Sequence, residues 1–174
     1  MANPQHIEWL LEGVDAWNKR REENDFIPDF ESADIHGAFE AADKLDEFGL
    51  ILLRGVNLRR AILTSANLKR ASLPAANLRR ANLENADLRM AYLEEAHLRQ
   101  TNLLGANLYR ANLEKADLRK ADLQEAYLRE ANLFAANLWR ANFRVTNLRE
   151  ANLVRANLQE ANLQRHLLPA QRWK

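Results

Sequence analysis

Hydrophobic residues recur every five positions through most of the chain. From residue 51 to residue 165 the sequence divides into 23 successive five-residue units, of which Ala-Asn-Leu-Arg-Arg at 76–80 is typical. The third position is Leu in 22 units and Phe143 in the other, and the first position is Ala in 19. Between them, the second position is Asn or Asp in 17 of the 23 units. An internal repeat this regular predicts a solenoid.

The period of five excludes both a long helix and a flat strand. In a helix, five residues rotate by about 140°, so the leucines would wind around the axis instead of forming a stripe. In a strand, an odd period would send alternate leucines to opposite faces. The pattern instead predicts three extended residues followed by a corner, with the first and third side chains inward and the second outward. Coils built this way hydrogen-bond to the coils above and below them.

Repeated Ala-(Asn/Asp)-Leu-x-x resembles the pentapeptide repeat proteins over about two thirds of the chain. The resemblance implies an all-β solenoid, a right-handed quadrilateral β-helix with four units per coil. The 23 units would then make about six coils, a tower roughly 27 Å tall at a strand spacing of about 4.8 Å. Units of the family often end in Gly, whereas only Gly55 and Gly105 do so here. Because bulky residues disfavour positive φ, we expect few corners with a left-handed residue.

Residues 1–50 form an acidic segment with a different pattern. Apolar residues at helical spacing predict a helix over 3–24, which would cap the exposed strand edges of the first coil. Residues 28–37 fit two repeat units and predict a partial coil. The next unit would bury the carboxylate of Glu40, so we expect the solenoid to be interrupted by an inserted helix over 38–48. This insertion either covers core at the side of the tower or projects as an acidic element that contacts a partner.

The residue types needed for catalysis are scarce. The chain has no Cys, its four histidines show no metal-ligand spacing, and no glycine-rich loop could hold a phosphate. We therefore expect no enzymatic activity, no catalytic residues, and no cofactor or metal site. No uncharged apolar run approaches the length needed to cross a bilayer, and the first residues lack a signal sequence, so we expect a cytoplasmic protein without a membrane partner.

The net charge of +1 conceals a strong asymmetry. Residues 1–50 carry 4 basic and 13 acidic residues, residues 51–165 carry 19 and 11, and the tail 166–174 adds two basic residues. With four units per coil, every twentieth residue stacks on the same wall. One wall then carries eight cations against Asp117 and Glu160: Arg59, Arg60, Arg79, Arg80, Arg99, Arg119, Lys120 and Arg140. The opposite wall carries a smaller excess of basic residues.

Two interpretations of the eight-cation wall are open. It could bind an anionic partner, because a concentrated positive field attracts anions. Alternatively, the long arginine stems could blanket the sheet and keep it from pairing edge to edge.

A second outward feature lies near the C-terminal end. Phe134 and Val154 should stack on one wall, with Trp139 on the adjacent wall and further apolar residues in the tail 166–174. Clustered exposed apolar side chains usually mark a contact. Either the tail folds over the last coil as a cap, or two copies form a homodimer through this end.

Together these features predict a non-enzymatic protein-interaction scaffold, a regulatory adaptor that presents the Arg wall to an acidic protein partner. The resemblance also implies an alternative, DNA mimicry at a type II topoisomerase. A mimic should be acidic, whereas residues 51–165 have a net charge of +8. Nucleic-acid binding through the Arg wall is the other alternative, weakened because only Trp139 could stack on a base there.

Overall fold

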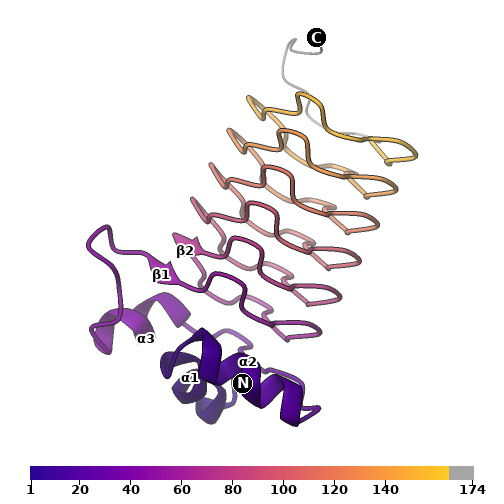
Figure 1. Ribbon diagram of the computed structural model, residues 1–174. Helices are drawn as coiled ribbons and strands as arrows, with labels where there is room; N and C mark the ends of the chain where they lie inside the picture. The colour runs from indigo at the N-terminus through magenta and orange to yellow at the C-terminus, as the bar shows by residue number, and fades with distance from the viewer. Residues whose placement is uncertain (165–174) are drawn as a thin grey trace.

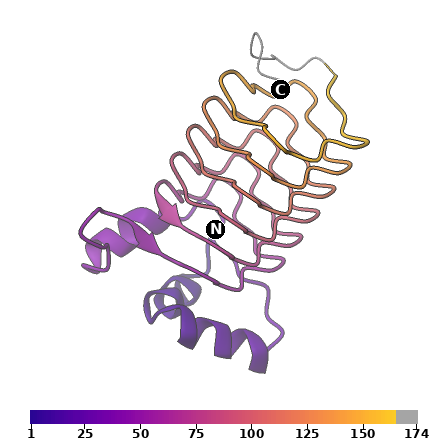
Figure 2. The same cartoon turned by 45° about the horizontal axis from the view of Figure 1, so that its top comes forward.

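The computed structural model describes residues 1–164, which form a tower of stacked coils above a small helical base (Figure 1). The elements in chain order are α1 (Pro4–Leu11), α2 (Val14–Glu23), α3 (Ile35–Ala41), β1 (Ile51–Leu52) and β2 (Ala71–Ser72). All three helices precede the tower, and successive coils rise along one axis toward residue 164 (Figure 2). Order along the chain is therefore order along the tower.

Backbone pairing within the tower has a constant interval of 20 residues. Parallel bridges join Asn57 to Asn77 and Asn77 to His97, and β1 pairs with β2 in the same register. The N–H of the third residue of a unit donates to the second residue one coil on, as from Leu58 to the C=O of Asn77 at 2.9 Å. Because each unit contributes little more than one bridging residue, the two named strands are only two residues long. Four five-residue units thus complete one turn of a β-helix.

The first and third side chains of each unit fill the interior. From Leu53 to Leu148, every third-position side chain is at most 1% exposed. Full burial of one such side chain stabilises the fold by about 1.5–3 kcal/mol. Thr101 and Thr146 replace Ala at buried first positions, and the Thr101 hydroxyl donates to the C=O of Leu78 at 2.8 Å. The core is therefore apolar, and its buried hydroxyls are hydrogen-bonded.

The corners contradict the expectation of few left-handed residues. The fifth residue of every unit from 51 through 160 has positive φ, including Arg80 at 59°. A hydrogen bond closes each corner in the manner of a type II turn, as from the N–H of Ala81 to the C=O of Leu78 at 3.0 Å. The N–H of Arg80 itself donates to the C=O of Arg99 in the next coil at 3.1 Å. The prediction was wrong because these backbone bonds outweigh the local preference of Arg, Lys and Glu for negative φ.

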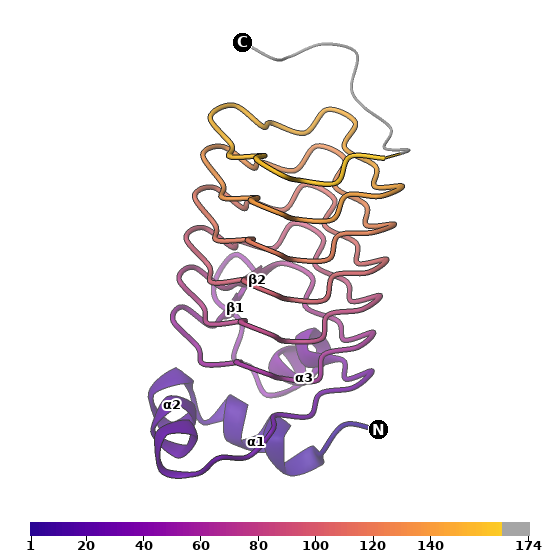
Figure 3. The same ribbon diagram turned by 90° about the vertical axis from the view of Figure 1, so that its right-hand side faces the viewer.

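The predicted single helix over 3–24 is also wrong, because the segment forms two helices, α1 and α2. Gly13 separates them with a φ of 109°, a conformation that residues with a Cβ rarely adopt. Leu10 of α1 and Trp17 of α2, 1% and 0% exposed, both lie in the core. The Trp17 Nε1–H donates to the C=O of Asn57 at 2.9 Å. Both helices consequently lie against the lower end of the tower (Figure 3).

The inserted helix has different bounds from those predicted. Asp29 and Asp34, within the segment 28–37, form parallel bridges to the coil above. However, α3 starts directly after Asp34, whose Oδ1 accepts the N–H of Gly37 at 2.9 Å and so caps the helix. The helix then ends at Ala41. The expected helix over 38–48 therefore begins too late and ends too late.

After α3 the chain forms a hairpin loop that projects from the side of the tower before β1 (Figure 1). Leu45 and Ile51 form an antiparallel bridge at its base. The Asp46 Oδ1 accepts the N–H groups of Phe48 and Leu50 at 2.9 and 2.8 Å, an arrangement that favours a turn over a helix. The Phe48 side chain near the tip is 65% exposed.

Candidate functional site

The second residue of each unit holds the corner from which the outward side chains project. Its Asn or Asp Oδ1 commonly accepts the N–H two residues on, as Asn77 does from Arg79 at 3.3 Å. Several of these asparagines also bond to one another between coils, as from Asn132 Nδ2 to Asn112 Oδ1 at 3.0 Å. Such contacts are why Asn and Asp are favoured at turns. They anchor each corner, so the fourth and fifth side chains project from it in columns.

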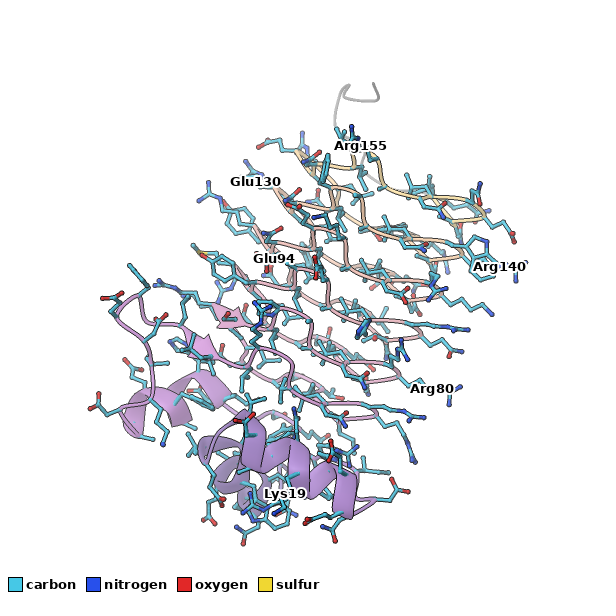
Figure 4. All side chains as sticks on the ribbon, viewed as in Figure 1. Lys19, Arg80, Glu94, Glu130, Arg140 and Arg155 are labelled. Atoms are coloured by element: carbon cyan, nitrogen blue, oxygen red, sulfur yellow. The ribbon has the colours of Figure 1, made fainter. Side chains whose placement is uncertain are left out.

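The 20-residue register brings all eight predicted basic residues onto one side, which we call the basic wall. Arg59, Arg79, Arg99 and Arg119 occupy the fourth position of successive units on this wall, and Arg60, Arg80, Lys120 and Arg140 occupy its corners. Figure 4 shows Arg80 and Arg140 projecting from one side of the tower, away from Glu94 and Glu130. Adjacent coils are only about 4.8 Å apart, so the cations of one column lie close together.

Both arginines in the upper half of the basic wall are neutralised by carboxylates. Arg119 donates from Nε and Nη2 to the two carboxylate oxygens of Asp117, each at 2.7 Å. These bonds, opposed by burial, lower the pKa of Asp117. Arg140 contacts Glu160 at 2.6 Å, and its guanidinium lies 4.3 Å from the centre of the Trp139 ring. The cations of this half already have partners.

Most cations of the lower half have no carboxylate partner in the described part of the chain; the exception is Arg60, whose Nη1 lies 3.9 Å from Asp25 Oδ1. Within residues 1–164, no carboxylate oxygen lies within 4.0 Å of a guanidinium nitrogen of Arg59, Arg79 or Arg99. Arg80 donates from Nε to the neutral amide oxygen of Gln100 at 3.3 Å. These five side chains line an open hollow of about 260 Å³. We call it the arginine hollow.

Helix α2 adds a cation that the sequence did not place. Arg21 donates from Nη2 to the C=O of Arg59 at 3.1 Å. Burial lowers the pKa of Arg21; Asp25 opposes that effect, and Arg60 and Arg59 reinforce it. A second hollow of about 270 Å³ adjoins the first through Arg59 and is lined by Arg21, Asp25, Asn57, Arg59 and Arg60. Only the docking of α2 onto the tower brings Arg21 here, so the sequence held no signal for it.

The opposite wall is compensated in part: within residues 1–164 three of its six cations have an ion pair, and Lys69, Arg70 and Arg149 have none. Arg89 pairs with Asp87 at 2.5 Å and Arg110 with Glu130 at 2.6 Å, while Arg129 lies 3.3 Å from Glu130. Burial raises the pKa of Asp87, but the hydrogen bonds and charge of Arg89 outweigh burial and hold that pKa below its usual value. A count of charges per wall could not separate paired from unpaired arginines, since pairing depends on which side chains meet.

The apolar residues near the C-terminal end do not form one patch. Phe134 and Val154 stack one coil apart, and the guanidinium of Arg155 lies 5.6 Å from the Phe134 ring centre. The ammonium of Lys120 lies 5.4 Å from the ring centre of Trp139 on the adjacent wall. Both rings are therefore partly covered by cations. The tail predicted as a cap lies outside the described residues.

Residues 1–164 offer no metal site and no membrane-spanning helix. That part of the chain has no group of three or more His, Asp or Glu side chains placed to hold a metal ion. None of its helices combines the length and hydropathy needed to span a bilayer. His6 is buried, stacks on Phe26 at 5.1 Å and accepts the N–H of Asp29 at 3.0 Å, so its contacts are those of a core residue.

The repeat and its β-helical geometry match a known family. The profile of the pentapeptide repeats matches residues 52–89, 90–124 and 126–165. The chain belongs to the pentapeptide repeat family. Proteins of this family form right-handed quadrilateral β-helices, so the predicted family and β-helical fold are confirmed. No curated protein sequence matches the chain.

Several solved structures of pentapeptide repeat proteins are similar to this chain. HetL, involved in heterocyst differentiation regulation in the cyanobacterium Nostoc sp. strain PCC 7120, is 31% identical over 68% of this chain and 64% of its own, with a TM-score of 0.46. QnrB1, a plasmid-mediated fluoroquinolone resistance protein, is 16% identical over 66% and 61%, with a TM-score of 0.56. Rfr23 from the cyanobacterium Cyanothece 51142 is 26% identical over 74% and 97%, with a TM-score of 0.37. The chain thus spans less than two thirds of HetL and QnrB1, and the likeness to QnrB1 shows the fold alone.

Proposed function

We propose that the chain is a non-enzymatic protein-interaction scaffold, a regulatory adaptor whose basic wall binds an acidic surface of a partner protein. The observation that carries this proposal is the arginine hollow, where Arg59, Arg79 and Arg99 have no carboxylate partner within residues 1–164. Unpaired cations on one face steer and orient an acidic partner, whereas internally paired cations do not.

The β-helix suits such a role because it holds the cations on a rigid frame. The backbone of each arginine in the column belongs to a corner with hydrogen bonds to adjacent coils, such as Arg60 N–H to Arg79 C=O at 3.0 Å. Little backbone entropy is then lost when a partner binds, so more of the interaction energy appears as affinity.

Capture from the native host tests the proposal. The test variant carries Arg79→Glu and Arg99→Glu, and the matched control carries Arg144→Glu and Arg149→Glu, which are exposed fourth-position arginines on other walls. We expect a specific acidic protein to be captured by the wild type and the control but not by the test variant. Equal capture by all three proteins excludes the basic wall as the binding surface.

Nucleic-acid binding is a less well supported use of the same wall. The pairing of Arg119 with Asp117 and of Arg140 with Glu160 shortens the track of free cations to the lower half. A duplex needs many phosphate contacts, and its affinity falls steeply with salt. Electrophoretic mobility shifts at low salt decide the matter: salt-sensitive binding favours nucleic acid, and no shift leaves the protein partner. DNA mimicry is not proposed, because the wall is basic.

We propose that α1 and α2 cap the lower end of the tower of about six coils. The Asn18 side chain accepts the N–H of Asn57 at 2.8 Å and donates to the C=O of Gly55 at 3.0 Å. Together with the Trp17 bond to Asn57, these contacts satisfy backbone groups at a strand edge that would otherwise be open. At the other end Leu158 is only half-buried, and a homodimer through that end would cover it.

A further inference from the structure

The arginine hollow has the charge and shape of a small anion site. Its guanidinium groups come from three successive coils, with Arg79 and Arg80 on the middle coil, Arg59 below and Arg99 above. The neutral amide of Gln100 completes the lining. Repulsion among four cations is tolerable in water but strongly favours any anion that enters between them.

The chain itself explains why these arginines are unpaired. Where the second residue of a unit is Asp and the fourth is Arg, the two pair within the unit, as Asp87–Arg89 and Asp117–Arg119 do at 2.5 and 2.7 Å. In the units of the hollow, that second residue is Asn57, Asn77 or His97 instead. The Asn oxygen still accepts the backbone N–H of the arginine, at 3.3 Å in both asparagine units, but it carries no charge. In these three units the second residue therefore supplies no carboxylate to pair with the arginine.

The dimensions favour a compact, doubly charged anion over a long one. The three free arginines of the column span two strand spacings, about 10 Å, and a hollow of about 260 Å³ has room for one phosphate and its attached group. Beyond Arg99 the ion pairs of Arg119 with Asp117 and of Arg140 with Glu160 leave few unpaired cations for an anionic polymer that continued along the wall. The planar guanidinium fork matches the three oxygens of a phosphate monoester through paired hydrogen bonds.

We propose that the arginine hollow binds a phosphate monoester dianion. The proposal deepens the proposed function and rests on it for its biological role, because a phosphorylated side chain of the partner is one source of this group and a free phosphate compound is the other. In either case Arg79 and Arg80 contact the phosphate oxygens from the middle coil, and Arg59 and Arg99 do so from below and above.

The test uses the purified full chain, so its outcome is independent of partner capture. The two probes are inorganic phosphate and a capped tripeptide with a central phosphoserine, each titrated in a low-salt, phosphate-free buffer and followed by the NMR signals of the arginine side chains. The unphosphorylated tripeptide is the negative probe. The key variant carries Asn57→Asp and Asn77→Asp, which installs the pair seen at Asp87–Arg89 while keeping every arginine and the oxygen that accepts the backbone bond.

Asn147→Asp is the matched control, because it makes the same substitution beside Arg149 on the opposite wall. We expect the double variant to bind phosphate about tenfold more weakly, because the new carboxylates occupy the guanidinium groups that would otherwise hydrogen-bond to the phosphate. The control should bind like the wild type. Tighter binding of the phosphopeptide than of phosphate assigns a protein source, and equal binding assigns a free phosphate compound; both results support the site.

A reciprocal variant guards against a double variant that fails to fold. Asp117→Asn should free Arg119 next to Arg99 and strengthen phosphate binding. The proposal is overturned if neither probe binds, if the unphosphorylated tripeptide binds equally, or if the control weakens binding as much as the double variant does. It is also overturned if Asp117→Asn gives no gain. Arginine-dependent capture of a partner without phosphate binding would refute this inference and leave the proposed function standing.

Discussion

Replacing alanine by glycine at a corner should stabilise the protein, the reverse of its usual effect. Ala75 and Ala135 occupy the fifth position of their units with φ of 55° and 54°. A residue with a Cβ costs about 1–2 kcal/mol in the left-handed region. Glycine costs about 0.5–1 kcal/mol more chain entropy than alanine. The difference predicts a gain of about 0.5–1 kcal/mol for Ala75→Gly or Ala135→Gly.

The neighbouring alanine provides a matched control in the same turn. Ala136 is 0% exposed and has no positive φ, so Ala136→Gly should destabilise the protein in the ordinary way. Ala75 and Ala135 are three coils apart, so their effects should add to about 1–2 kcal/mol. Urea unfolding followed by circular dichroism measures the free energy of unfolding. The midpoint of thermal unfolding should rise by about 2–4 °C for each kcal/mol gained. A loss of stability in both corner variants would refute the account of the corners.

Substitutions at Thr101, Asp117 and Gly13 test a hydrogen bond, an ion pair and a backbone conformation. Thr101→Val should destabilise the protein by about 1 kcal/mol in urea unfolding, because it removes the hydroxyl that donates to the C=O of Leu78. Asp117→Asn should lower stability at neutral pH. Because Arg119 lowers the folded-state pKa of Asp117, the contribution is present above its unfolded pKa and disappears as pH falls through the folded value, so wild type and variant should converge in acid. Gly13→Ala should cost about 1–2 kcal/mol, since nothing crowds the added Cβ but φ is 109°; an unchanged unfolding midpoint would contradict a strained junction.

The sequence predicted where the basic residues of the candidate site lie, but not which of them are ion-paired. Once the register is known, the column Arg59, Arg79, Arg99 and Arg119 follows from the sequence alone, because every twentieth residue stacks on the same wall. That Arg119 is neutralised while the other three are free depends on Asp117 reaching the guanidinium two residues on. A count of charges gives only the net charge of the wall. Whether two charged side chains form an ion pair depends on a distance of a few ångströms between them.

In the helical base, too, the sequence predicted the type of secondary structure but not its exact bounds. The apolar spacing of residues 3–24 correctly indicated helix, but it did not indicate the break at Gly13, where φ is 109° in the structure. The start of α3 is set by the side chain of Asp34, which caps the helix while the backbone of the same residue still forms a bridge to Asn67.

By itself, the sequence determined the family, the period and the composition of the core, because a five-residue repeat of small and large apolar side chains has few ways to bury itself. Only the tertiary structure decided the backbone at the corners and the ionic state of the wall. The left-handed backbone conformation is unfavourable for residues such as Arg80 and Lys120. They adopt it because backbone hydrogen bonds to neighbouring coils stabilise it. Likewise, Arg59, Arg79 and Arg99 stay uncompensated because the coils stack them together where no carboxylate of residues 1–164 comes within reach.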